Sequence, residues 1–231
     1  MADGTCTDVD NERTSGPEGD ATLTMADTAH PKIARTDHDV LDVIRHRWSP
    51  RAFDASREIP AADVHRLFEA ARWAPSSRNE QPWRFVVVDR RRSPQGHAAL
   101  LSSLTPKNQI WAQAAAVLVL VAVRLTHEHG EVVNSHAWYD AGQAVAFLSL
   151  QATGMGLATR QMQGFDAAMA RAACRVPDPF EPAVVIAVGH EGDPATLSID
   201  AHRSAEMAPR ERRALDQFVF DSTWDRAFDP A

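Results

Sequence analysis

The sequence has little cysteine and no long apolar run. Cys6 and Cys174 are the only cysteines among 231 residues, and no C-x-x-C pair is present. Two thiols so placed do not form a disulfide framework. No stretch reaches the roughly 18 apolar residues that span a bilayer, and the first residues lack a basic segment followed by an apolar run. We therefore expect a soluble, cytoplasmic protein with no membrane partner.

Signature motifs of several large enzyme classes are also missing. The sequence contains no G-x-G-x-x-G at a strand-to-helix turn, no Walker A motif, no H-E-x-x-H and no G-x-S-x-G. A Rossmann dinucleotide site, a P-loop, a zinc protease and a serine hydrolase are thus unsupported. His127 and His129 flank Glu128, but no third ligand stands nearby in the sequence, so we expect no metal site.

Charge is unevenly spread along the chain. The net charge is −7, and residues 1–38 carry eight acidic and three basic side chains, so most of the acidity lies there. No basic surface for nucleic acid is indicated. Residues 1–38 also contain no aromatic residue and no periodicity, which predicts a disordered acidic leader before a domain at 39–231. A docking tail for a partner is the alternative interpretation.

Apolar strands and amphipathic helices alternate irregularly within 39–231. Continuous apolar runs predict buried strands, and the expected strands cover 85–88, 116–123, 157–161 and 182–189, with a strand-like run at 218–220. Helical patterns occupy the connections, from Pro60 through Ala71, at 94–115 with a break near Pro106, at 135–153 and after Asp166. The helix at 135–153 has few polar residues, so it should be buried at a domain centre or a subunit interface. This arrangement predicts the α+β class, a central sheet flanked by helices.

Two polar segments could bind a ligand. Arg47, Ser49 and Arg51 stand at alternate positions, so in extended chain they point the same way. Two guanidinium forks and a hydroxyl suit a phosphate, although arginine-rich helix ends are usually just solvated. The second segment is a loop between a helix and a strand, stiffened by Pro75 and Pro82. It can be read as an ordinary capped connection or as a rigid set of donors and acceptors.

Four separated segments together resemble the nitroreductase family of flavin mononucleotide (FMN) enzymes. They are R-W-S-P-R-A-F at 47–53, A-P-S-S-R-N-E-Q-P-W at 74–83, G-M-G-L-A-T-R-Q-M-Q-G-F-D at 154–166 and P-R-E-R-R-A-L at 209–215. Their order and spacing cover about residues 39–224 and exclude the leader. The resemblance implies a central mixed or antiparallel sheet and an intertwined homodimer with two shared flavin sites.

The resemblance also implies roles for individual residues. The flavin phosphate and ribityl chain would be held by Arg47, Ser49 and Arg51, with Arg210 and Arg212 approaching from the C-terminal segment. Gln163 and Gly164 would lie beside the flavin ring, with a backbone N–H directed at its N5. Contacts across the subunit boundary would come from Pro75, Ser76, Ser77 and Asn79. The sequence leaves open whether Asn108, Arg160 and Met162 line the site.

The activity implied by the resemblance is FMN-dependent oxidoreduction. NADH or NADPH would give hydride to flavin N5, and a small nitroaromatic or quinone acceptor would then be reduced in a ping-pong cycle. Relatives with other flavin chemistry, namely dehalogenation, azoline oxidation or flavin fragmentation, are one alternative. A flavin-binding sensor or carrier with little turnover is another.

Overall fold

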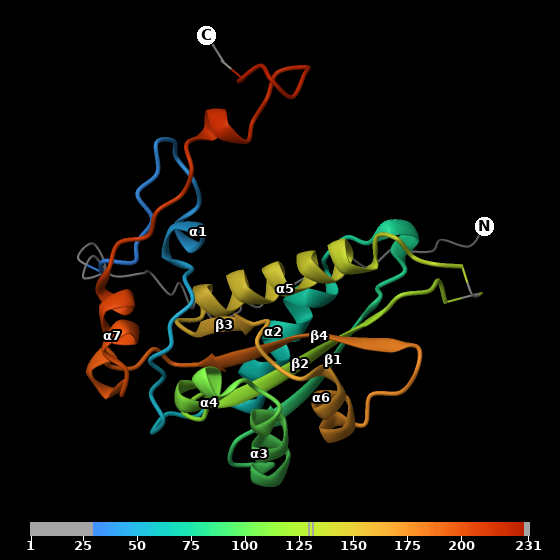
Figure 1. Cartoon of the computed structure of the whole chain (residues 1–231), viewed down its shortest axis with the longest axis vertical. Coiled ribbons are helices and arrows are strands. Elements are labelled where there is room, and N and C mark those ends of the chain that lie inside the picture. Colours follow the sequence, from blue (N-terminus) through green and yellow to red (C-terminus); the bar gives the residue numbers. More distant parts are fainter. Residues whose placement is uncertain (1–29, 129, 131, 229–231) are drawn as a thin grey trace, which may run out of the picture. The chain divides into compact units, whose positions relative to one another are not determined.

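One four-stranded antiparallel sheet lies at the centre of the unit Pro31–Ala231 (Figure 1). The computed structural model describes residues 30–128, 130 and 132–228. The strand order is β1-β2-β4-β3. The strands are β1 Trp83–Asp89, β2 Val117–Arg124, β3 Ala158–Met162 and β4 Phe180–Gly189. The α+β class and the central antiparallel sheet are therefore confirmed.

Helices cover both faces of this sheet (Figure 1). The helices are α1 Asp42–His46, α2 Ala61–Arg72, α3 Pro94–Ser102, α4 Pro106–Ala112, α5 Ala137–Gly154, α6 Ala167–Cys174 and α7 Asp200–Met207. Side chains alternate along β2, so Val119 and Val121 pack with α2 and α5, while Leu118 and Leu120 pack with α3, α4 and α6. Two apolar layers thus enclose β2, which explains its unbroken apolar sequence. Among the described helices, none has both the length and the hydropathy of a membrane span.

Helix α5 is the longest helix described, with 18 residues. It ends at Gly154, and Gly156 adopts a φ of +68°, which favours glycine after a helix end. One face is buried, but Trp138, Tyr139 and Phe147 on this helix are 51%, 69% and 41% exposed. Within one chain, the predicted burial of this helix therefore holds for one face only.

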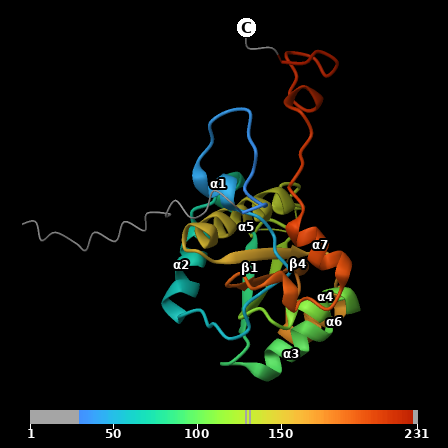
Figure 2. The same ribbon diagram turned by 90° about the vertical axis from the view of Figure 1, so that its left-hand side faces the viewer.

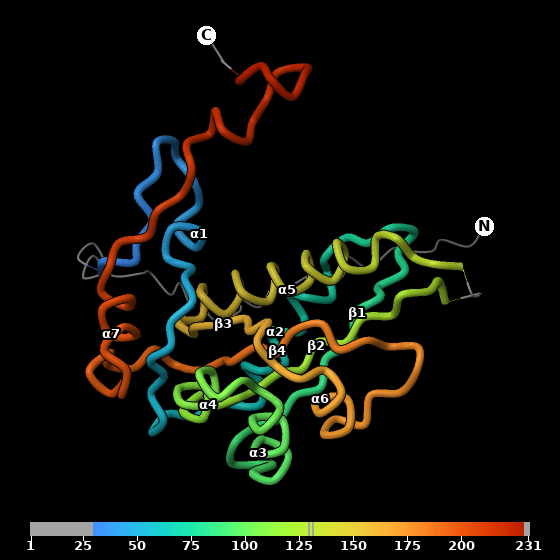
Figure 3. The backbone as a smooth tube through the Cα atoms, viewed as in Figure 1, coloured from blue at the N-terminus to red at the C-terminus, as the bar shows by residue number. Residues whose placement is uncertain are grey.

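The C-terminal region differs from expectation. Helix α7 has no regular apolar stripe and was not predicted, and 218–220 is not a strand: Phe220 forms only an isolated bridge with Ala227. Residues 209–228 leave α7 beside the segment at 32–46, as Figures 2 and 3 show. Arg210 joins the two segments by donating to the carbonyl oxygens of Arg45 and Arg47.

Most of the predicted leader, residues 1–29, lies outside the described residues. The compact unit that contains the sheet begins at Pro31. Residues 31–38 thus belong to the same unit as the sheet, and Lys32 is 7% exposed.

The doubly enclosed strand β2 gives a stability prediction. Leu120 is fully buried, so Leu120→Ala leaves a cavity, and we expect it to lower the free energy of unfolding by about 2–5 kcal/mol. Urea denaturation measures this change. Val132→Ala is the control, because Val132 is 68% exposed and its truncation creates no cavity. Equal losses in the two variants would contradict the packing described for β2.

Candidate functional site

A cationic pocket lies between the extended segment at 47–51, strand β3 and helix α7. Its volume is about 200 Å³. It is lined by Lys32, Arg47, Trp48, Ser49, Arg51, Arg160, Ala205, Glu206, Arg210 and Arg212. Six of these side chains are cationic and one, Glu206, is anionic. The structure therefore gathers Arg47, Ser49, Arg51, Arg210 and Arg212, all of which the sequence had singled out.

Glu206 organises one wall of the cationic pocket. Its carboxylate is 2% exposed and accepts hydrogen bonds from the backbone N–H groups of Arg51, at 2.9 Å, and Ala52, at 3.4 Å. It also forms an ion pair with the guanidinium of Arg51 at 3.6 Å. A buried carboxylate needs such partners. Glu206 thus fixes the extended segment against α7, and sequence reasoning missed it because α7 itself was not predicted.

Two further cations join the pocket. Arg160, on β3, donates from Nη1 to the carbonyl oxygen of Ser49, and its guanidinium lies 5.3 Å from the centre of the Trp111 ring. Lys32 donates from Nζ to the carbonyl oxygens of Ala205 and Ala208, both at 2.5 Å, at the C-terminal end of α7. Arg160 is thereby placed in the site. Lys32 was missed because its segment has no pattern of its own.

The electrostatics of the pocket favour an anion. Burial, and then the neighbouring Arg51, lower the pKa of Arg160 to about 10, while Glu206 opposes the shift. Burial also lowers the pKa of Arg47 and Arg210, and each is lowered further by nearby arginines. Arg210 Nε is buried and has no hydrogen-bond partner within the described residues. A phosphate among these groups would supply both the missing charge and the missing acceptor.

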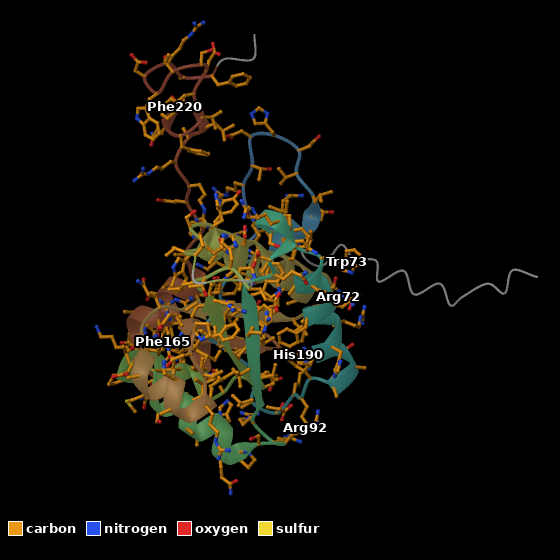
Figure 4. All side chains as sticks on the ribbon, turned by 90° about the vertical axis from the view of Figure 1, so that its right-hand side faces the viewer. Arg72, Trp73, Arg92, Phe165, His190 and Phe220 are labelled. Atoms are coloured by element: carbon orange, nitrogen blue, oxygen red, sulfur yellow. The ribbon has the colours of Figure 1, made fainter. Side chains whose placement is uncertain are left out.

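The turn at Gln163 and Gly164 follows β3 directly. The carbonyl oxygen of Gly164 accepts hydrogen bonds from the N–H of Thr105, at 3.0 Å, and from Asn108 Nδ2, at 3.1 Å. A Cβ on Gly164 would lie 3.0 Å from Asn108 Nδ2 and 3.1 Å from Thr105 Oγ1. A side chain at position 164 would therefore be crowded by Asn108 and Thr105 of the same chain, and the hydrogen bond from Asn108 holds the turn. Phe165, labelled in Figure 4, pairs with Leu104 beside it.

Gln163 and Met162 have opposite environments. Gln163 is exposed at the turn. Met162 is 3% exposed and packs in the apolar layer with Leu104 and Trp111, so in this chain it lies within the core and does not line the cationic pocket.

The polar loop at 75–82 has a strained backbone. Arg78, Asn79 and Gln81 have φ values of 55°, 57° and 47°, a region that costs non-glycine residues free energy. The N–H of Ser77 donates to the buried carboxylate of Asp140 at 3.0 Å, and the N–H of Gln81 donates to Ser76 Oγ at 3.0 Å. These contacts over-determine the loop conformation. Pro75 and Asn79 remain exposed on its outer side.

The loop that contains His127 and Glu128 contacts the polar loop at Glu80. Glu80 accepts a hydrogen bond from the N–H of Glu128 at 3.0 Å, and His127 Nδ1 lies 3.1 Å from the Glu80 carboxylate. His127 therefore has a structural contact. His129, considered with it above, lies outside the described residues.

The strand register keeps the polar loop and the cationic pocket apart. Pro82 accepts from the N–H of Arg124 at one end of β2. Arg160 pairs with Ala187, which pairs with Leu118 near the other end of β2. Arg124 and Leu118 are six residues apart on β2, which corresponds to about 20 Å along the strand. One chain thus carries both predicted halves of the site without bringing them together.

Comparison with known proteins gives consistent results. Residues 44–190 match the sequence model described as the nitroreductase family. The chain is 31% identical over 169 residues to a putative NADH dehydrogenase/NAD(P)H nitroreductase of Burkholderia lata, covering 64% of this chain and 85% of that protein. It is 38% identical over 124 residues to an uncharacterized 15.4 kDa protein of Mycolicibacterium smegmatis, covering 54% and 82%. A crystal structure described as an oxidoreductase containing FMN superimposes with a TM-score of 0.77 at 30% identity, covering 83% of this chain and 96% of that one.

The buried carboxylate of the pocket gives the next prediction. Glu206→Ala removes the acceptor of two backbone N–H groups and the partner of Arg51, so we expect a loss of about 2–4 kcal/mol in the free energy of unfolding. Added phosphate should raise the melting temperature of this variant. Glu69→Ala, which truncates an exposed carboxylate on α2, is the control. Its free energy of unfolding, and its melting temperature with added phosphate, should equal those of the wild type. A Glu206→Ala protein as stable as wild type would refute the role given to this contact.

Proposed function

Since this chain belongs to the nitroreductase family, we propose that it is an FMN-dependent oxidoreductase that uses NADH or NADPH. The observation that carries the proposal is the cationic pocket, in which six basic side chains surround one carboxylate. The solved structure described as an oxidoreductase containing FMN and the putative NADH dehydrogenase/NAD(P)H nitroreductase of Burkholderia lata support the same activity.

The residues of the pocket fit the phosphate of FMN. A phosphate monoester carries close to two negative charges at neutral pH and accepts several charge-assisted hydrogen bonds. Arg47 Nη1 donates to Ser49 Oγ at 3.2 Å, so a guanidinium and a hydroxyl lie together at the wall. Arg210 lines the same pocket and is held there by donating to the carbonyl oxygens of Arg45 and Arg47. We assign the phosphate and ribityl chain to Arg47, Ser49 and Arg51, with one of Arg210 and Arg212 near the phosphate and the other near the pyrimidine edge.

The remaining groups would position the ring. The Gln163–Gly164 turn is anchored by Thr105 and Asn108, so its backbone presents a fixed N–H at the side of the ring. When bound, FMN supplies the redox chemistry, taking hydride from the nicotinamide and reducing a small nitroaromatic or quinone acceptor in a ping-pong cycle. A guanidinium near the pyrimidine would stabilise the negative charge that reduction places there.

We further propose a homodimer with two shared sites. Trp138, Tyr139 and Phe147 on α5 are partly exposed, and they give this helix an apolar surface that a partner could cover. The loop with Pro75, Ser76, Ser77 and Asn79 lies far from the cationic pocket of its own chain. A two-fold partner would bury the apolar surface and bring each loop to the other chain's pocket.

Spectroscopy tests the proposed activity. The purified protein should absorb as a flavoprotein, and NADH or NADPH should bleach it without oxygen. Arg47→Ala should weaken FMN binding about 10- to 100-fold through loss of a charged hydrogen bond. Arg92→Ala is the control, since Arg92 is exposed after the opposite edge strand β1 (Figure 4).

Three other outcomes would change the assignment. A protein that stays colourless after FMN is added would rule out flavin function. Flavin binding without bleaching by either nucleotide would favour the relatives with other flavin chemistry. Binding with negligible steady-state reduction of an acceptor would favour a sensor or carrier.

Mixing two variants tests the shared sites. Arg47→Ala disables the pocket, and Asn79→Ala disables the loop that the partner supplies. After subunit exchange, a heterodimer would combine both substitutions in one site and leave the other site intact. We expect about a quarter of the wild-type FMN sites to return in an equal mixture. Each variant mixed with itself is the control, and a lack of recovery after verified exchange would show that the two residues act in the same site of one chain.

A further inference from the structure

We propose that Asp140 is a positioning residue that sets the loop at 76–81 in the shape required for FMN binding. This inference rests on the proposed flavin function and adds a residue that none of the four sequence segments contains. Asp140 lies in the first turn of α5, where the positive end of the helix dipole favours a carboxylate.

The side chain of Asp140 is buried and contacts the backbone of the loop. Its side chain is 2% exposed, and Oδ2 accepts from the N–H of Ser77 at 3.0 Å. A charge so deeply buried is costly unless its acceptors are used. Ser77 stands directly before the residues with positive φ, Arg78 and Asn79. The carboxylate therefore fixes the point at which the chain enters the strained turn.

Strain gives this contact its functional meaning. Residues in the left-handed region are strained, and the surroundings must compensate. The internal contacts of the turn, from Gln81 N to Ser76 Oγ and from Gln81 Nε2 to the Asn79 carbonyl, span only the turn itself. Asp140 ties the start of the turn to α5, a rigid element, whereas Glu80 ties its end to the loop at 127–128. Without the tie to α5, the exposed Asn79 would sample other conformations, and FMN binding would have to order it again.

The distance from the pocket makes the effect specific. Asp140 is on the loop side of the sheet and does not line the cationic pocket. A substitution there cannot change the pocket's charge directly. A loss of FMN affinity that disappears when Asn79 is also substituted would then pass through the loop.

The test measures FMN affinity and stability separately. We expect Asp140→Ala to raise the Kd for FMN about 10- to 100-fold, the effect of losing one charge-assisted hydrogen bond. Asp140→Asn keeps an acceptor for Ser77 and should raise it less, so it serves if the alanine variant does not fold. The melting temperature of the FMN-free Asn variant should stay near that of wild type. Asp63→Ala removes a first-turn carboxylate from α2 and should leave the Kd unchanged.

A double-mutant cycle separates positioning from general structural damage. If Asp140 acts through the loop, Asn79→Ala should cost less affinity in the Asp140→Ala protein, whose loop has lost its acceptor for Ser77, than in the wild type. Fully additive effects would overturn the proposal, as would a Kd in both Asp140 variants equal to that of the Asp63→Ala control. Wild-type protein that binds no FMN would instead remove the proposed function, and this inference with it.

Discussion

The cationic pocket depends on Glu206, which forms an ion pair with Arg51 and accepts two backbone hydrogen bonds. Six basic side chains do not gather around a small cavity unaided, because burial and mutual repulsion disfavour their charges. Glu206 offsets part of that cost and holds the segment at 51–52 by two N–H groups. Arg160 and Arg210 are fixed through neutral carbonyl oxygens, those of Ser49 and Arg47. The pocket is thus rigid and retains a positive charge, which is the condition for recognising an anion rather than merely tolerating one.

A second buried carboxylate plays the corresponding part at the other end of the sheet. Asp140 accepts from the backbone of the polar loop, just as Glu206 accepts from the backbone of the extended segment. In both places a helix carries an acid that binds main-chain N–H groups, so the recognition side chains themselves remain available. The strands separate the two halves by about 20 Å within one chain. Assembly and function are therefore linked by geometry in the proposed dimer.

The sequence allowed the sheet and most helices to be predicted, because their signals are local. The continuous apolar runs of β2 and β4 and the glycines after α5 indicate their structure without reference to partners. The recognition arginines were also identifiable, from alternation at Arg47 and Arg51 and from a resemblance that spans several segments. By contrast, α7 has no apolar stripe, and Lys32 stands in a segment with the composition of a leader. Both are placed by tertiary contacts, Lys32 through the carbonyl oxygens at the end of α7, and no local pattern reports such contacts.

The same distinction explains why the two carboxylates were not found. A motif is recognised by residues that face a ligand, whereas Glu206 and Asp140 face the protein's own backbone. Their positions follow from which helix packs behind each segment, a property of the assembled fold. Gly164 illustrates the point from the other direction: the resemblance places it beside a flavin ring, yet a Cβ there would already lie 3.0 Å from Asn108 Nδ2 and 3.1 Å from Thr105 Oγ1 of its own chain. A residue can satisfy a structural and a functional constraint together, and only the structure separates the two.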